Sequence, residues 1–145
     1  MRDVPRGGLI LDTHVWIWVI EGAGDELSKT AIDEIDAVSR RGEVLISAIS
    51  VWEVAMLEAR GRISLSRALA DWVDAALRAP GTRLLQISPH IAIESTRLPG
   101  SPPGDPADRI IVASARSVGA RVTTRDERII RYAGAGHLSV LDARP

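Results

Sequence analysis

Cysteine is absent from this 145-residue chain. Its absence excludes disulfides, thiolate nucleophiles and every zinc or iron–sulfur site that needs cysteine ligands. The three histidines, His14, His90 and His137, lie far apart and none belongs to a His-x-x-x-His pair, which disfavours a nitrogen-rich metal site. Carboxylates are the ligands that are left, and they bind hard cations such as Mg²⁺ or Mn²⁺.

Long hydrophobic runs and a strong net charge are also absent. The longest apolar stretch, residues 9–20, is interrupted by Asp12 and His14, is too short to span a bilayer and is followed by no small-residue cleavage site. Positive charge is almost all arginine, and 18 basic against 19 acidic residues give a formal net charge of −1, unlike a polybasic nucleic-acid-binding domain. We therefore expect one soluble, cytoplasmic domain.

Short apolar runs alternate with longer stretches of helical period along the whole chain. This alternation predicts an α/β fold of three layers, with a central parallel sheet of about five strands and helices on both faces. The strands are expected at residues 8–11, 43–47, 84–87, 121–124 and 138–141. The helices are expected at residues 14–20, 27–41, 50–59, 66–79, 89–96, 105–117 and 126–132.

Four acidic residues occupy positions that can meet at one edge of such a sheet. Asp12 and Asp126 each directly follow an expected strand, and Glu53 and Asp108 lie in the first turns of expected helices. Ligands of parallel sheets bind at the carboxyl ends of the strands. Clustered carboxylates raise each other's pKa unless a cation neutralises them. A divalent cation there would hold a phosphate oxygen and activate water, which favours phosphodiester hydrolysis.

Most of these acids also have a helix-capping interpretation. Ser50 and Glu53 have the spacing of a capping box, and Asp105 precedes a proline at the first position of a helix. Asp126 can cap the helix that follows it, and for single residues of this kind capping is the more frequent role. Asp12 is the hardest to explain in this way, because it ends a buried strand without a basic neighbour at that end.

Four segments together resemble a known family. Leu9-Ile-Leu-Asp-Thr-His-Val-Trp16, Ile49-Ser-Val-Trp-Glu-Val-Ala55, Asp105-Pro-Ala-Asp-Arg-Ile-Ile-Val-Ala113 and Thr123-Thr-Arg-Asp-Glu-Arg-Ile129 are similar to the motifs of a PIN domain. The similarity is greatest to VapC-like ribonuclease toxins of type II toxin–antitoxin pairs, and it extends from Leu9 to Leu141. It implies a single domain with residues 1–8 as a short extension, and a Mg²⁺- or Mn²⁺-dependent endoribonuclease. It also implies a homodimer and a VapB-like antitoxin whose tail blocks the active site.

The resemblance also implies roles for particular residues. The catalytic, metal-binding acids would be Asp12, Glu53, Asp108 and Asp126. Supporting positions around them would be Thr13, Asp105 and Thr124. Arg109 and Arg125 are nearest to the acids in sequence and are expected to contact substrate phosphates. The alternative for these and the other arginines of residues 109–131 is that they pair with acids elsewhere in the protein.

Tryptophan dominates the small aromatic content of the chain. Trp16, Trp18, Trp52 and Trp72 are expected in the core or in a dimer interface because their neighbours are apolar. Trp52 lies beside Glu53, so stacking of a nucleobase at the site is the alternative for this residue.

Three other kinds of protein share part of this pattern. A phosphoacceptor receiver domain is excluded, because it needs an acidic pair after the first strand and a late lysine, whereas Asp12 stands alone and Lys29 is the single lysine. A non-catalytic binding module, in which the acids are only helix caps, stays open. A metal-dependent phosphatase of small substrates stays open as well.

Overall fold

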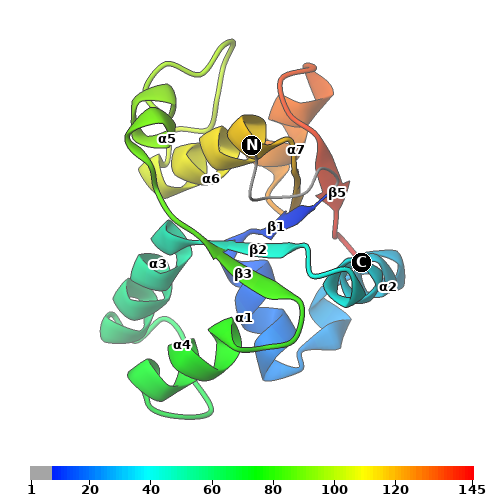
Figure 1. The fold of residues 1–145 in the computed structure, drawn as a ribbon, viewed down its shortest axis with the longest axis vertical. Coiled ribbons are helices and arrows are strands. Elements are labelled where there is room, and N and C mark those ends of the chain that lie inside the picture. Colours follow the sequence, from blue (N-terminus) through cyan, green and yellow to red (C-terminus); the bar gives the residue numbers. More distant parts are fainter. Residues whose placement is uncertain (1–7) are drawn as a thin grey trace.

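The computed structural model describes residues 8–145 and contains a five-stranded sheet, which Figure 1 shows across the middle of the molecule. Its strands are β1 (Leu9–Leu11), β2 (Val44–Ser47), β3 (Thr82–Leu85), β4 (Arg121–Thr124) and β5 (Val140–Asp142). All neighbouring strands are parallel, in the order β3-β2-β1-β4-β5. The predicted α/β fold is therefore confirmed. The strand order changes direction between β1 and β4, where parallel sheets open a ligand crevice.

Helices cover both faces of the sheet (Figure 1). One face carries α1 (Thr13–Glu21), α2 (Lys29–Arg40), α3 (Ala48–Ala59) and α4 (Leu69–Leu77), together with the short 3₁₀ helix η1 (Gly24–Glu26). The other face carries α5 (Pro89–Glu94), α6 (Pro106–Val118) and α7 (Glu127–Gly134). In the described part of the chain no helix is both long and apolar enough to cross a membrane.

Each face of the sheet has its own hydrophobic core. Leu9 and Leu11 belong to the core under α1–α4, whereas Ile10 between them belongs to the core under α6 and α7. Because strand side chains alternate between the two faces and both faces are buried, all positions of the strand are apolar. This is why the central strands appear in the sequence as uninterrupted apolar runs.

The tryptophans divide into two groups. Trp16 and Trp72 are buried in the first core and meet edge to face, with ring centroids 5.1 Å apart. The prediction of core tryptophans is confirmed for this pair. Trp18 is only half-buried, and Trp52 is 57% exposed. The core position is therefore wrong for Trp52, whereas a place in a dimer interface or under a nucleobase stays a prediction for this residue.

Three helices begin two or more residues from their predicted starts, namely α2 at Lys29, α3 and α4. Helix α3 begins at Ala48, and the Ser47 hydroxyl caps it by accepting from the backbone N–H of Ile49 at 3.2 Å. Helix α4 begins at Leu69 instead of Ser66, because the Ser66 hydroxyl donates to Glu21 at 2.7 Å and holds the preceding loop against α1. For α3 and α4 the start of the helix depends on the partner of a serine hydroxyl. Ser47 accepts from the backbone of its own helix, whereas Ser66 donates to a side chain of another helix.

The third strand begins two residues before its predicted position. Parallel pairing of Val44 with Thr82 fixes this start. The turn before it needs Gly81, which has a φ of 81° and passes so close to α2 that a Cβ there would lie 1.9 Å from the carbonyl oxygen of Ser39. The fifth strand begins two residues later than predicted, at Val140.

The predicted N-terminal extension, residues 1–8, lies outside the described residues except for Gly8. Gly8 is buried, and its carbonyl oxygen accepts from the backbone N–H of Arg121 at 3.0 Å. The pairing between β1 and β4 therefore already involves residue 8.

Candidate active site

Asp12 lies where β1 ends beside β4. Its backbone N–H donates to the carbonyl oxygen of Thr123 at 3.0 Å, which continues the parallel ladder by one residue. One carboxylate oxygen accepts from the N–H of Thr13 at 2.8 Å and caps α1, and the other accepts from the Thr124 hydroxyl at 2.7 Å. Burial raises the pKa of Asp12 above its usual value, although both hydrogen bonds oppose this shift. Capping thus explains one oxygen of Asp12 and leaves its burial unexplained.

Glu53 reaches the same edge of the sheet from α3. The Thr13 hydroxyl donates to the Glu53 carboxylate at 2.5 Å, and the Ser50 hydroxyl oxygen lies 2.8 Å from that of Thr13. Because the single hydroxyl proton of Thr13 is directed to Glu53, Ser50 is the donor to Thr13. Burial raises the pKa of Glu53, and the bond from Thr13 opposes this.

The predicted capping box of Ser50 and Glu53 is therefore wrong. Both residues lie inside α3, one turn apart on the same face, and both are directed at Thr13 on α1. Their three-residue spacing fits either arrangement, so the sequence alone does not distinguish them. Ser50 was not predicted as a site residue, and its position one turn before Glu53 is the signal that could have identified it.

Asp108 lies in the first turn of α6, held there by its N-cap residue. The Asp105 carboxylate accepts from the backbone N–H of Asp108 at 3.0 Å, so the predicted cap is confirmed. Burial, followed by the negative charges of Asp12, Asp105, Asp126 and Glu53, raises the pKa of Asp108 to about 8. The structure thus brings the four predicted acids into one electrostatic cluster.

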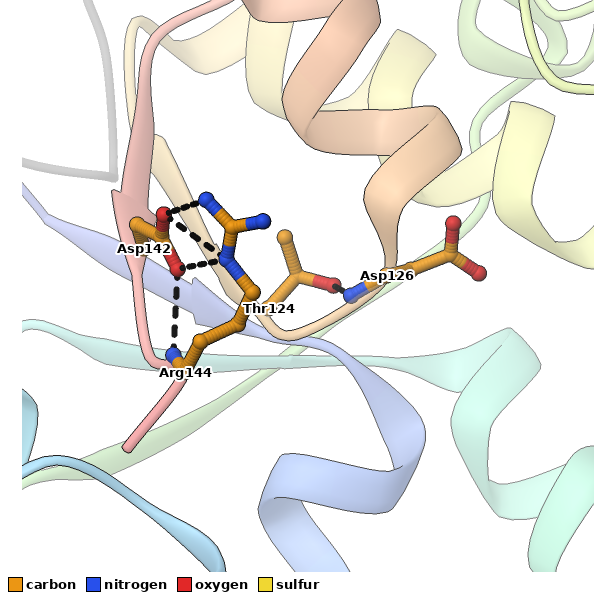
Figure 2. A network of polar contacts seen from close by, with 4 residues as sticks. All are labelled: Thr124, Asp126, Asp142 and Arg144. Atoms are coloured by element: carbon orange, nitrogen blue, oxygen red, sulfur yellow. Dashed lines mark hydrogen bonds and ion pairs between the residues drawn. The ribbon is translucent and has the colours of Figure 1, made fainter.

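Asp126 follows β4 and caps α7, as predicted. One of its carboxylate oxygens accepts from the backbone N–H of Arg128 at 2.8 Å and of Ile129 at 3.3 Å. Its own N–H donates to the Thr124 hydroxyl at 2.9 Å, and Figure 2 shows its carboxylate directed away from that bond. The Thr124 hydroxyl therefore connects two acids, since it accepts from Asp126 and donates to Asp12.

No ion pair balances this acidic cluster within the described residues, and the one opposing charge that acts on Asp12, that of His14, does not outweigh burial. None of the four acids forms an ion pair with another described residue. Nor are any three histidine, aspartate or glutamate side chains of residues 8–145 already arranged as a set of metal ligands. The chemistry of the donors nevertheless fits a hard divalent cation, because all four are carboxylates and their repulsion would be relieved by such a charge.

The two arginines predicted to contact substrate have partners in the protein. Nη1 of Arg125 donates to the Glu26 carboxylate at 2.6 Å, and Nε of Arg109 donates to the carbonyl oxygen of Pro103 at 2.7 Å. Arg121 pairs with Glu34 on α2. The alternative of internal pairing is thus confirmed for Arg121 and Arg125, and phosphate contact stays a prediction.

Comparison with known proteins agrees with this arrangement. The family model of the PIN domain matches residues 9–135. Ribonuclease VapC22 of Mycobacterium tuberculosis is 34% identical over 121 residues, which cover 83% of this chain and 88% of that protein.

Solved structures share the fold at lower sequence identity. VapBC2 from Rickettsia felis, bound to a DNA fragment from its promoter, superposes with a TM-score of 0.66 at 15% identity, over 93% of this chain and 98% of that one. FitAcB from Neisseria gonorrhoeae superposes with a TM-score of 0.60 at 20% identity, over 92% and 96%. Since the family model spans all four acids and the identity to the relative extends over most of both chains, this protein belongs to the PIN-domain family.

Proposed function

We propose that this chain is an endoribonuclease that hydrolyses RNA phosphodiester bonds, and that it is the toxin of a VapBC-type toxin–antitoxin pair. The observation that carries the proposal is the cluster of four carboxylates at the carboxyl edge of the sheet, none of which forms an ion pair within the described chain. A ribonuclease among the relatives, Ribonuclease VapC22, supports it.

Divalent metal dependence is general among PIN-domain ribonucleases. For this chain we assign the metal as Mg²⁺ or Mn²⁺, held by Asp12, Glu53, Asp108 and Asp126. Such an ion would neutralise phosphate charge and would make water a better nucleophile near neutral pH. Hydrolysis by water leaves a 5′-phosphate and a 3′-hydroxyl.

The hydroxyl and capping residues around the acids position them. Thr124 and Thr13 hold the carboxylates of Asp12 and Glu53 in one orientation through the hydrogen bonds described above. Asp105 fixes the first turn of α6 and, with it, the backbone of Asp108. Hydrogen bonds of this kind make a site rigid before the substrate arrives.

The proposal includes partners and a location. The solved structures of VapBC complexes support a VapB-like antitoxin as a partner. We propose that its tail covers the active site. We assign a homodimer as well, and the exposed Trp52 on α3 and Ile93 on α5 offer apolar side chains for its interface. We propose a cytoplasmic location, because the RNA substrate is there.

The test is cleavage of a mixed pool of structured and single-stranded RNA by purified protein, free of antitoxin, with Mg²⁺, Mn²⁺ or EDTA. We expect cleavage with either metal, none with EDTA, and none by Asp12→Asn or Asp108→Asn. Asp33→Asn is the matched control, because Asp33 is an exposed acid on α2 paired with Lys29 at 2.9 Å. A folded wild-type protein that cuts no RNA contradicts the proposal. Hydrolysis of small phosphate monoesters instead would identify a phosphatase, and neither activity would favour a binding module.

A further inference from the structure

A hollow of about 410 Å³ opens directly beside two of the acids. Its size lies within the range of about 300–1,000 Å³ that is common for small-ligand sites. The residues that matter for its chemistry come from three segments: Asp12, His14 and Trp18, then Glu26, then Arg125 and Asp126. This hollow is therefore an extension of the acidic site toward η1 and the outer turn of α1.

One wall of the hollow is made of flat groups. His14 and Trp18 lie one turn apart on α1, with ring centroids 5.8 Å apart. The guanidinium carbon of Arg125 lies over the Trp18 ring, 4.9 Å from its centroid. His14 is exposed and Trp18 and Arg125 are half-buried, so this wall is accessible to a ligand. Nucleobases stack on aromatic rings and on guanidinium planes alike.

The polar edge of the hollow offers both a donor and an acceptor. Nη1 of Arg125 donates to the side chain of Glu26 at 2.6 Å and to its backbone carbonyl oxygen at 3.1 Å. Two bonds to one residue hold the guanidinium in place without a ligand. The exposed Glu26 carboxylate can accept from an amino group of a base, and the guanidinium can donate to a ring nitrogen or carbonyl oxygen.

The charge of the hollow decides between possible occupants. Three of its residues, Asp12, Glu26 and Asp126, are acidic, and Arg125 is already paired with one of them. Away from a metal ion, a phosphate or a peptide carboxylate in this hollow would be repelled. A nucleobase is neutral, flat and rich in hydrogen-bonding groups, and it is not repelled.

We propose that this hollow is a nucleobase subsite, which takes the base of a nucleotide adjoining the cleaved phosphodiester and stacks it on the surface formed by His14, Trp18 and Arg125. The inference rests on the proposed ribonuclease function and adds to it the element that positions the RNA. It also assigns Arg125 a role at the base instead of at a phosphate.

A binding experiment tests this without cleavage. The chain has four tryptophans, whose indole N–H signals can be assigned in ¹⁵N-labelled protein by single Trp→Phe variants. The probes are the four nucleoside 5′-monophosphates and ribose 5-phosphate, each with Mg²⁺. We expect at least one nucleotide to shift the Trp18 signal saturably, while the buried Trp16 and Trp72 do not respond. Equal shifts with ribose 5-phosphate, or no shift at Trp18 with any nucleotide, would overturn the proposal.

A cleavage experiment adds the functional consequence. The substrate is an RNA with one cut site, compared with copies that lack the base at a single position on either side of the cut. For the wild type, removal of one particular base should slow cleavage about 5- to 150-fold, which is the conversion of about 1–3 kcal/mol per stacked base. For Trp18→Leu and His14→Ala, the intact and base-less RNAs should be cut at similar rates.

His90→Ala is the matched control for His14→Ala, because it makes the same chemical change at an exposed histidine on α5, outside the hollow. It should retain the wild-type dependence on the base. His14→Ala guards against misfolding of Trp18→Leu, since His14 is exposed. If the variants retain the full effect of base removal, the subsite is refuted. If no RNA is cut by any form, the proposed function fails, and the indole signals still decide whether the hollow binds a base.

Discussion

Two strands of the same sheet end near an acid, and the two acids differ in their surroundings. Asp142 ends β5, and Figure 2 shows Arg144 wrapped around it through its backbone N–H and its guanidinium. These bonds hold the pKa of Asp142 below its usual value. Asp12 follows β1, where hydroxyl and backbone donors bind it but no cation does, and burial raises its pKa.

The same contrast separates the periphery of the molecule from its acidic site. Around the periphery, Asp33, Asp36 and Asp74 each pair with a basic residue one helical turn away. Such exposed pairs contribute little to stability, because water already solvates both charges. At the site, burial and the charges of neighbouring acids oppose the charged state of Asp12, Glu53 and Asp108. Strongly raised pKa values in a cleft are typical of functional positions, so the comparison separates acids with a structural role from acids with a chemical one.

The largest expected effect separates capping from catalysis at Asp126. Serine can cap a helix as aspartate does, so Asp126→Ser preserves the cap of α7 and removes the carboxylate. We expect RNA cleavage to fall about 100-fold or more, beyond the loss typical for residues that only orient a ligand, with little change in Tm. Asp105→Ser is the control, since Asp105 is an exposed cap of α6, and it should retain most activity. Equal activities of the two variants would mean that Asp126 serves only as a helix cap.

A smaller effect is expected at the hydroxyl that connects two acids. Thr124→Val removes the donor to Asp12 and the acceptor of the Asp126 N–H at almost constant volume. Cleavage should fall about 10- to 100-fold, as for other residues that orient metal ligands. Thr123→Val is the matched control, because the Thr123 hydroxyl is buried without a hydrogen-bond partner among the described residues. Similar losses for both variants would mean that the sheet, and not the bond to Asp12, was disturbed.

The raised pKa of Asp108 predicts a pH dependence of stability without metal. Its pKa is about 8 in the folded protein, whereas the ordinary value of an aspartate is 3.8, so between these values the folded state binds more protons than the unfolded one. The contribution of Asp108 to the free energy of unfolding is therefore fully present below about pH 4, and it is lost as the pH rises through 8. In EDTA at pH 9, Asp108→Asn should have a Tm about 3 °C or more above that of the wild type.

That difference should become small at pH 5, where Asp108 is protonated in the folded wild type. Addition of Mg²⁺ at pH 9 should raise the Tm of the wild type more than that of Asp108→Asn, because the cation stabilises the charged carboxylates. Thermal unfolding followed by circular dichroism measures both differences. A wild type that is as stable as the variant at pH 9 without metal would contradict the repulsion inferred for the site.

The smallest effect is expected at the paired acid. Arg144→Gln removes the guanidinium from Asp142, so the pKa of Asp142 should return toward its usual range, as followed by an NMR titration of its carboxyl carbon. RNA cleavage should stay within about twofold of the wild type, because an exposed pair of this kind contributes little. A large loss of activity would show that β5 belongs to the site after all.

Much of the fold could be predicted from the sequence. β4 has its predicted bounds, residues 121–124. They could be predicted because three β-branched residues, Val122 to Thr124, follow closely on the glycine that caps the end of α6. The predicted position of β3 was wrong by two residues, because its true position depends on pairing with β2, and the local sequence does not encode that pairing. The capping box at Ser50 failed for a related reason, since a hydroxyl one turn from a carboxylate also fits a contact with Thr13 on another helix.

The sequence by itself determined the parallel α/β architecture, the absence of thiol chemistry and the four acids, because apolar periodicity and residue type are local properties. Only the tertiary structure decided which groups those acids meet. The change of strand order beside β1 brings Thr124 to Asp12 across 112 positions of the chain, and the packing of α1 on α3 brings Thr13 to Glu53. The tertiary structure also brings Arg125 over the Trp18 ring, beside the acids. Contacts between distant segments depend on the global register of strands and helices, which no single stretch of sequence encodes.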